Sequence, residues 1–198
     1  MKKGIIGNGG FGREVYYSLT EYERENTIFF VDDEYFSNQE NTKPLSHLDV
    51  NEYEIVVAVG DPVLRSNIVS KLPKNTKYFT HIHESVIILG DDVYIGEGSI
   101  ICAGSILTTN IQIGSHSHLN LNTTIGHDCT MGNFFTTAPG VSISGNNIIG
   151  DRVYFGTRSS SKQKLNICCD VTIGLNSGVV KNINESGTYV GTPSVKLK

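Results

Sequence analysis

The dipeptide His127-Asp128 is the part of this chain whose residue types and spacing best suit proton transfer. His127 directly follows Gly126, so its imidazole can project from a corner of the backbone. Adjacent side chains on a regular strand point to opposite faces, so the pair can meet only where the backbone bends. If they meet, Asp128 holds one ring nitrogen as a donor and leaves the other as a base. An exposed turn histidine beside an exposed turn acid is the alternative, and the spacing does not decide between them.

The other histidines raise the question of a metal site; they are His47, His81, His83, His116 and His118. A zinc site needs several such ligands converging on one ion. The periodicity described below stacks residues that are eighteen positions apart, and no two histidines have that separation. We therefore expect no metal within one chain, although a site assembled between subunits would escape this test.

The N-terminal segment GNGGFG has the composition of a phosphate-binding loop. Its glycines from Gly7 to Gly12 match GxGxxG, and Asp32-Asp33 follows about twenty residues later, as in dinucleotide-binding folds. A complete dinucleotide fold needs two such halves, and the chain before the repeats has room for one. We expect a nucleoside diphosphate, with its phosphates over Gly9 and Gly10 and with Asp32 or Asp33 on the ribose or base. A glycine turn that merely packs a helix on a strand is the alternative.

The elements that must position these residues are of two kinds, and the larger is a repeat. From Asp91 to Val180 the chain keeps a six-residue period without an insertion, and the fifth position is apolar in thirteen of fifteen hexads. Neither a helix nor a flat strand has this period, whereas a coil of three short strands does. The ninety residues predict five triangular coils, and Leu89-Gly90 extends the pattern.

The first eighty residues lack this rhythm and alternate apolar runs with helical patterns, which predicts a small α/β unit. The expected elements are a strand ending at Ile6, a helix through Leu19, strands at Thr27–Val31 and Ile55–Val59, a helix at Val63–Leu72 and a last strand at Tyr78–Thr80. The predicted domains are therefore residues 1–80 and 81–198.

The composition of the chain limits the kinds of partner that we expect. The net charge is −4 and no basic run occurs, so we expect no nucleic-acid partner. The N-terminus MKKGIIGNGG resembles neither a signal peptide nor a membrane span, which favours a cytoplasmic protein.

The combination of GNGGFG, repeats carrying IGHDCTMGNFFTTAPGVSISGN and a tail reading VGTPSVK resembles the sugar acetyltransferases of the left-handed β-helix class. It is similar, more narrowly, to the sialic acid O-acetyltransferase and bacillosamine-pathway N-acetyltransferase group. The resemblance covers nearly the whole chain. It implies an N-terminal half-Rossmann-like α/β unit followed by an all-β left-handed parallel β-helix, and a homotrimer with acetyl coenzyme A in a groove between adjacent prisms.

The resemblance also implies roles for individual residues, with His127 as the general base and Asp128 as the acid that tunes it. Its nucleotide or sugar contacts fall on Gly9, Gly10, Phe11, Asp32, Asp33 and Gly60. Its coenzyme contacts fall on Thr136, Gly145, Thr157 and Leu175. Some members carry histidine where this chain has Phe11 and Thr136, and some carry Glu at the position of Asp128.

The function implied is direct acetyl transfer from acetyl coenzyme A to the amino group of a UDP- or dTDP-linked amino sugar, for a surface glycan or glycoprotein. O-acetylation of a sialic acid or related nonulosonate is the close alternative, because the same residues would serve a hydroxyl. A metal-dependent lyase of the carbonic anhydrase type and a non-catalytic trimeric scaffold are more distant alternatives.

The hexad from Thr157 to Lys162 departs from the pattern, since it lacks the apolar inward residue. It predicts either a loosened coil with solvated charges or a contact between Arg158, Lys162 or Lys164 and the phosphates of the coenzyme.

Overall fold

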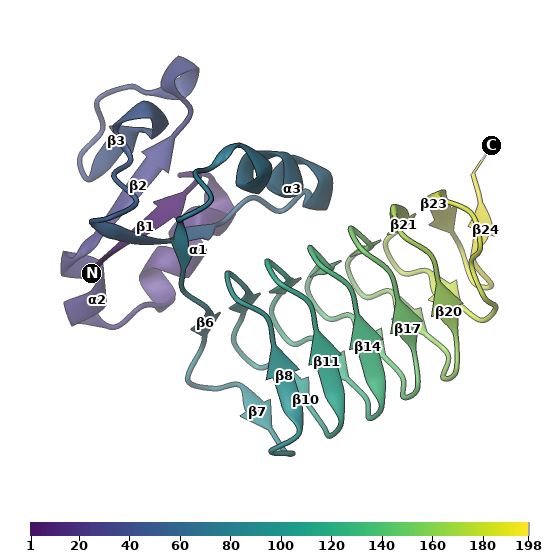
Figure 1. Cartoon of the computed structure of the whole chain (residues 1–198). Helices are drawn as coiled ribbons and strands as arrows, with labels where there is room; N and C mark the ends of the chain where they lie inside the picture. The colour runs from purple at the N-terminus through teal and green to yellow at the C-terminus, as the bar shows by residue number, and fades with distance from the viewer. Residues whose placement is uncertain (198) are drawn as a thin grey trace.

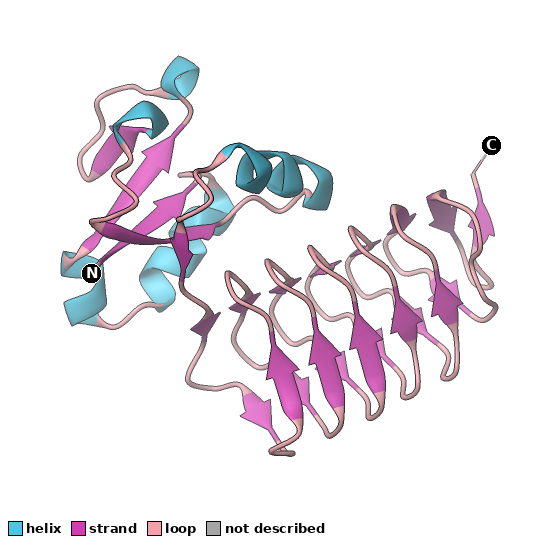
Figure 2. Cartoon of the chain, in the orientation of Figure 1, coloured by secondary structure: helices cyan, strands magenta, loops and turns pink. Residues whose placement is uncertain are grey.

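The chain forms an N-terminal α/β domain with a parallel sheet, followed by a parallel β-solenoid, in the computed structural model, which describes residues 1–197 (Figure 1). This confirms the predicted fold class. Within the described residues the helices all belong to the N-terminal domain, and the solenoid consists of strands and turns (Figure 2).

The N-terminal sheet has the strand order β3-β2-β1-β4-β5, and its paired strands all run parallel. Its strands are β1 (Lys2–Ile6), β2 (Thr27–Val31), β3 (Thr42–Pro44), β4 (Tyr53–Val57) and β5 (Lys77–Tyr78). Its helices are α1 (Gly10–Ser18), α2 (Glu21–Glu25) and α3 (Pro62–Lys71), with 3₁₀ turns η1 (Asp33–Tyr35) and η2 (Leu45–His47). The sequence did not predict β3, which has three residues, or α2, which buries none of its side chains.

Three sheets form the walls of the solenoid, and we name each by one central strand. The β13 sheet consists of β7 (Ile87–Ile88), β10 (Ile106–Leu107), β13 (Thr124–Ile125), β16 (Ser142–Ile143), β19 (Ser160–Ser161) and β22 (Gly178–Val179). The β14 sheet consists of β8 (Val93–Ile95), β11 (Ile111–Ile113), β14 (Cys129–Met131), β17 (Ile148–Ile149) and β20 (Asn166–Ile167). The β12 sheet consists of β6 (His81–Ile82), β9 (Ile100–Ile101), β12 (His118–Leu119), β15 (Thr136–Thr137), β18 (Tyr154–Phe155), β21 (Val171–Ile173), β23 (Gly187–Val190) and the antiparallel β24 (Val195–Lys196).

The strand register explains where the six-residue period of the sequence starts. Inside the repeat each residue pairs with the one eighteen positions later, as Thr124 does with Ser142. Before the repeat the spacing is nineteen, since Ile87 pairs with Ile106, and the prediction that Leu89 continues the inward column is wrong. The extra residue turns Leu89 outward, and it is 67% exposed.

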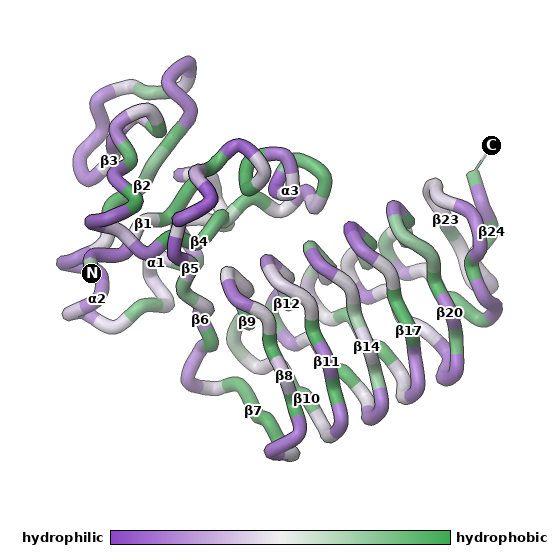
Figure 3. Tube along the Cα trace, viewed as in Figure 1, coloured by the Kyte–Doolittle hydropathy of each residue, from purple (hydrophilic) through white to green (hydrophobic). Residues whose placement is uncertain are grey.

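The core of the solenoid is the stack of inward hexad positions, such as Leu107, Ile125 and Ile143, which form one buried cluster. Hydrophobic segments accordingly recur along the coils (Figure 3). Ser161, one of the two polar exceptions with Thr137, is buried and receives a hydrogen bond from the buried Asn147 amide at 3.0 Å. Its strand β19 pairs with strands on both sides, so the predicted loosened coil is absent from this part of the described chain.

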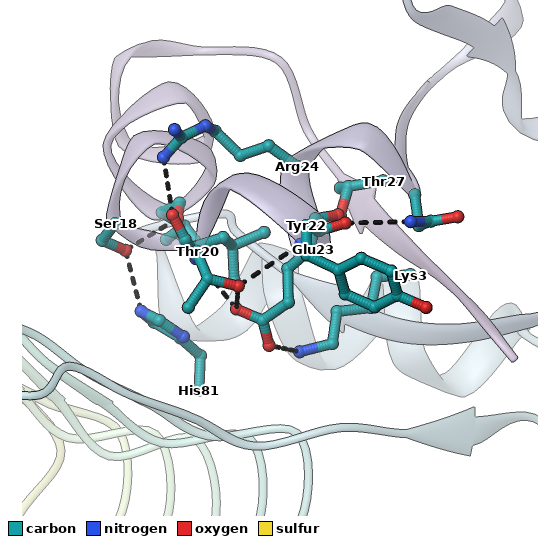
Figure 4. Close-up of polar contacts among 11 residues, drawn as sticks. Lys3, Ser18, Thr20, Tyr22, Glu23, Arg24, Thr27 and His81 are labelled. Carbon is teal, nitrogen blue, oxygen red and sulfur yellow. Dashed lines mark hydrogen bonds and ion pairs between the residues drawn. The ribbon is translucent and has the colours of Figure 1, made fainter.

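The N-terminal domain covers the outer face of the β12 sheet at the first coils (Figure 1). Ile100, His118 and Thr136 point outward from successive strands and would be exposed in the solenoid alone, yet each is at most 3% exposed. Ser18 of α1 adds a hydrogen bond of 2.7 Å to His81 of β6 (Figure 4). The two domains are therefore packed together as one body on this face.

No helix among residues 1–197 combines the length and the apolar character that crossing a membrane requires.

Candidate active site

His127 lies on one edge of the solenoid, which we call the histidine corner: the turns at residues 108–110, 126–128, 144–146, 162–164 and 180–182, between the β13 and β14 sheets. Asp128 has φ of 58°, in the left-handed region, and this bend brings the two adjacent side chains together. His127 Nδ1 and Asp128 Oδ2 are 2.7 Å apart. The geometric condition that the sequence left open is therefore met.

Asn110, one coil earlier, completes the group. Its Nδ2 donates to the second carboxylate oxygen of Asp128 at 2.7 Å. The hydrogen bond from Asn110 and then that from His127 lower the pKa of Asp128 from its usual value. A carboxylate with both oxygens accepting hydrogen bonds stays ionised and is held in one orientation.

Gly145, one coil later, forms a shelf under the imidazole. A Cβ atom at this position would lie 2.8 Å from ring atoms of His127, so a larger residue would push the ring away. The backbone N–H of Asn146 donates to the His127 carbonyl at 2.8 Å. Contacts with the next coil therefore hold His127 in place, while its side chain remains 54% exposed.

This arrangement selects a tautomer. An ionised carboxylate can only accept, so Nδ1 of His127 carries the hydrogen and Nε2 keeps its lone pair. An imidazole oriented in this way can take a proton from an amine or hydroxyl brought to Nε2.

Four of the six predicted substrate residues are divided between two cavities. A pocket of about 610 Å³ in the N-terminal domain lies at the carboxyl ends of β1 and β2 and includes Gly9 and Asp32 among its lining residues. Gly10 and Asp33 are not part of that lining. The Asp33 carboxylate instead accepts from the Ser46 N–H at 3.1 Å. The Ser46 side chain and then this N–H lower the pKa of Asp33.

Phe11 and Gly60 line a second pocket of about 240 Å³, where the N-terminal domain meets the solenoid. Thr136 and Thr157, two of the predicted coenzyme residues, also line it. The structure therefore brings together residues that the resemblance assigned to different ligands.

Thr136 belongs to a set of buried and half-buried residues that we call the domain junction: Phe11, Arg65, His116, His118 and Thr136. Arg65 of α3 is fully buried and donates to carbonyl groups of both domains. Its acceptors are Val59 O in the N-terminal domain, and His116 O at 2.9 Å and Phe134 O at 3.0 Å in the solenoid. Its Nη2 also donates to Thr136 Oγ1 at 2.5 Å. Burial lowers the pKa of Arg65 to about 9.

Thr157 and Leu175 lie on a different edge, which we call the leucine corner: the turns at residues 102–105, 120–123, 138–141, 156–159 and 174–177. Leu175 is 70% exposed there. A single chain does not bring this edge to His127, because the β13 sheet lies between the two corners. Of the predicted coenzyme residues, Gly145 alone shares the corner of His127.

The histidines outside the histidine corner do not form a metal site in the described chain. Among residues 1–197 no three His, Cys, Asp or Glu side chains converge as metal ligands would. His116 stacks on Phe134 with ring centroids 5.2 Å apart, and burial lowers its pKa to about 4. His118 packs against Phe11, and burial followed by the charge of Arg65 keeps its pKa well below the usual value.

Sequence reasoning missed Asn110 and Arg65. Asn110 had a usable signal, because it precedes Asp128 by eighteen residues, which is one coil. Arg65 had none, because it lies on an ordinary helix of the other domain and its acceptors are mostly backbone carbonyls.

Comparison with known proteins supports the same class of chemistry. Residues 4–72 match the model of the PglD N-terminal domain family. The GDP-perosamine N-acetyltransferase of Escherichia coli O157:H7 is 29% identical over 189 residues, which cover 81% of this chain and 77% of that enzyme.

Two solved structures cover almost the whole chain. WeeI from Acinetobacter baumannii AYE has a TM-score of 0.86 and 30% identity and covers 100% of both chains. The acetyltransferase domain of PglB from Neisseria gonorrhoeae FA1090, solved in complex with acetyl coenzyme A, has a TM-score of 0.87 and 25% identity, covering 99% of this chain and 98% of that chain.

Proposed function

This chain belongs to the PglD-type hexapeptide-repeat sugar N-acetyltransferases, and from that premise we propose its acceptor and the roles of its residues. It is an acetyl-coenzyme-A-dependent N-acetyltransferase of a nucleotide-linked amino sugar. The acceptor we propose is a UDP- or dTDP-linked amino sugar that is used for a surface glycan or glycoprotein. Its nucleotide binds in the pocket of about 610 Å³ beside Gly9 and Asp32.

The observation that carries the mechanism is the His127–Asp128–Asn110 arrangement, with one imidazole nitrogen tied and the other free. Acetyl coenzyme A supplies an activated acetyl thioester. His127 Nε2 takes the proton of the acceptor amine as its nitrogen bonds to the acetyl carbon, and later returns a proton to the departing sulfur. Asp128 holds the ring and stabilises the imidazolium that forms between these events. No covalent acyl-enzyme is required.

The positions of Thr157 and Leu175 support a site shared between chains. The histidine corner carries His127 and Gly145, whereas Thr157 and Leu175 lie on the leucine corner. We propose a homotrimer in which the histidine corner of one prism faces the leucine corner of the next, with acetyl coenzyme A in the groove between them. Light scattering should then give the mass of three chains.

The test is acetyl transfer to a panel of acceptors, measured as release of free coenzyme A thiol. The panel holds UDP-, dTDP- and GDP-linked amino sugars, the matching acetamido sugars and a sialic acid. We expect turnover with a UDP- or dTDP-linked amino sugar and none with its acetamido control. Turnover of the sialic acid alone would instead establish O-acetylation, and turnover of the GDP sugar alone would exclude the proposed nucleotides.

A further inference from the structure

The two domains are joined by a short link and by contacts on the face that they share. The link is residues 79–80, between β5 and β6. The hydrogen bond of 2.7 Å between Ser18 and His81 lies next to this link (Figure 4). Contacts so close to the link resist rotation about it only weakly, because their lever arm is short. Contacts further along the solenoid therefore matter most for the angle between the domains.

Arg65 makes contacts of this distant kind. It reaches from α3, which extends over the coils, to His116 O at 2.9 Å and Phe134 O at 3.0 Å (Figure 1). These residues precede β12 and β15, which are two and three coils beyond β6 in the same sheet. Neighbouring strands are about 4.8 Å apart, so the two contacts lie about 10 and 14 Å from the coil that carries the link.

The same guanidinium holds the loop that borders both proposed substrate pockets. Its Nη1 donates to Val59 O and Gly60 O, and its Nη2 also donates to Thr136 Oγ1. Together with the bonds to the solenoid carbonyls this makes five hydrogen bonds, as many as the side chain has N–H groups. Val59 lines the pocket of about 610 Å³, and Gly60 lines that of about 240 Å³. Arg65 therefore connects the pocket loop directly to the backbone of the solenoid.

Burying this charge has a cost that an apolar side chain would avoid. Arg65 is fully buried and forms no ion pair among residues 1–197. Apolar packing could join the domains without that cost, but the hydrophobic effect has no preferred direction. Five hydrogen bonds from one planar guanidinium specify both distance and angle. The side chain is therefore suited to fixing an orientation.

The orientation matters because α3 also forms part of the nucleotide pocket. Leu64, Ile68 and Lys71 of α3 line the pocket of about 610 Å³. His127 belongs to the solenoid. In the proposed trimer the solenoids are fixed against one another, so the angle of each N-terminal domain on its own solenoid sets the distance from its nucleotide pocket to the histidine corner of the next prism.

We propose that Arg65 is a positioning residue for acetyl transfer: it fixes the angle of the N-terminal domain on the solenoid, so that a sugar whose nucleotide occupies the larger pocket presents its amine to a His127 Nε2 atom. The inference rests on the proposed function, since it needs the nucleotide in that pocket. Arg65 lines neither pocket and acts through the loop of Val59 and Gly60. A misplacement of about 1 Å in a reacting group can cost about 10²-fold in rate.

The experiment separates binding from transfer in Arg65→Met, Arg65→Lys and the control Lys74→Met. Lys74 is exposed, follows α3, lines neither pocket and makes no ion pair among residues 1–197. The acceptor is the nucleotide-linked amino sugar with the highest turnover in the panel. Release of coenzyme A thiol gives kcat and KM. Calorimetric titration with acetyl coenzyme A, and with UDP or dTDP to match the acceptor, gives the affinity and the number of sites.

In Arg65→Met we expect kcat to fall about tenfold, because the amine is no longer held beside the base. The acceptor KM, both affinities and both site numbers should stay those of the wild type, since each ligand still meets a folded domain. Arg65→Lys keeps three donors and should fall between the wild type and Arg65→Met. If Arg65→Met does not fold, Arg65→Lys makes the same test with a smaller effect. Lys74→Met should match the wild type throughout.

Wild-type kcat in both Arg65 variants would overturn the inference and leave the proposed function standing. A fall in kcat matched by an equal fall in the number of binding sites would also overturn it, because the loss would then come from unfolded protein and not from misplaced substrate. A wild-type protein that turns over no nucleotide-linked amino sugar would refute the proposed function, and the inference with it.

Discussion

His127 and His118 are nine residues apart in sequence and lie in environments that differ in what controls proton transfer. The His127 side chain is 54% exposed and its Nδ1 is bonded to a carboxylate. His118 is 1% exposed, and its ring nitrogens form no hydrogen bond of good geometry, although the Val57 backbone lies near the ring. Burial and then the charge of Arg65 keep the pKa of His118 well below its usual value, whereas the His127 ring is in contact with solvent and is oriented by a carboxylate.

The difference teaches that an imidazole can serve as a base on this scaffold when it is exposed to solvent and a neighbouring side chain orients it. On the histidine corner the solenoid provides both, with Asn110 and Gly145 one coil to either side. At the domain junction the same kind of side chain contributes packing surface. Substitutions at the corner should therefore change the rate, and substitutions of the junction histidines should change stability.

The largest effect expected is that of His127→Ala. Loss of the general base should lower kcat by at least two orders of magnitude, which is about 2.7 kcal/mol or more in the barrier. Affinity for acetyl coenzyme A and the urea midpoint of unfolding should stay near those of the wild type, because the side chain is half exposed. Unchanged turnover would remove His127 from its proposed role.

Arg65→Met should have the largest effect on stability. The substitution removes a buried guanidinium and takes a hydrogen-bond donor from carbonyl groups of both domains, at a cost of about 3 kcal/mol. Urea unfolding measures this cost. The control is Lys71→Met on the same helix, an exposed site where we expect a change below about 0.5 kcal/mol. Equal midpoints for the two variants would show that the junction does not depend on Arg65.

His118→Ile should act in the opposite direction. Isoleucine already occupies the equivalent outward position one coil earlier, at Ile100, and the substitution removes two buried nitrogens that form no hydrogen bond of good geometry. We expect a gain of about 1 kcal/mol in the free energy of unfolding at neutral pH, since unpaired buried polar groups are costly. A loss of stability would mean that the imidazole has a partner that its packing does not reveal.

The same variant, His118→Ile, should also change how the free energy of unfolding depends on pH. The folded protein holds the pKa of His118 well below its usual value and that of His116 at about 4. As pH falls below about 6.5, these histidines bind protons in the unfolded chain but not in the folded chain, so the free energy of unfolding falls. In His118→Ile this fall should be shallower, because one of these groups is gone. Chemical denaturation at several pH values between 7 and about 4.5 measures the slope.

The two regions also differ in how far the sequence predicted them. The solenoid followed from a strict six-residue period, and the glycine-preceded turn marked His127 and Asp128 as candidates without deciding whether they meet. The contact between the pair needed the positive φ of Asp128, which the sequence allowed but did not require. Asn110 would have followed from the eighteen-residue spacing alone.

The domain junction was beyond prediction for a physical reason. His118 and Thr136 are outward residues of the repeat and are buried only because another domain covers them. The position of that domain depends on contacts such as Arg65 to backbone carbonyls, which leave no pattern in either segment. The hydrogen bond from the Ser46 N–H to the Asp33 carboxylate is another contact between distant segments that the sequence did not indicate.

The smallest effect expected is that of Asn110→Ala, and it tests how much orientation matters once the base is present. Asp128 would keep His127 and lose one hydrogen bond, so its pKa should rise towards the usual value. We expect kcat to fall about threefold to tenfold, which corresponds to roughly 1 kcal/mol for one hydrogen bond to a charged group at an exposed site. The matched control is Asn146→Ala, one coil later, whose side chain makes no hydrogen bond to the pair. If both variants retain full activity, the turn itself orients the Asp128 carboxylate, and the hydrogen bond from Asn110 is not needed for catalysis.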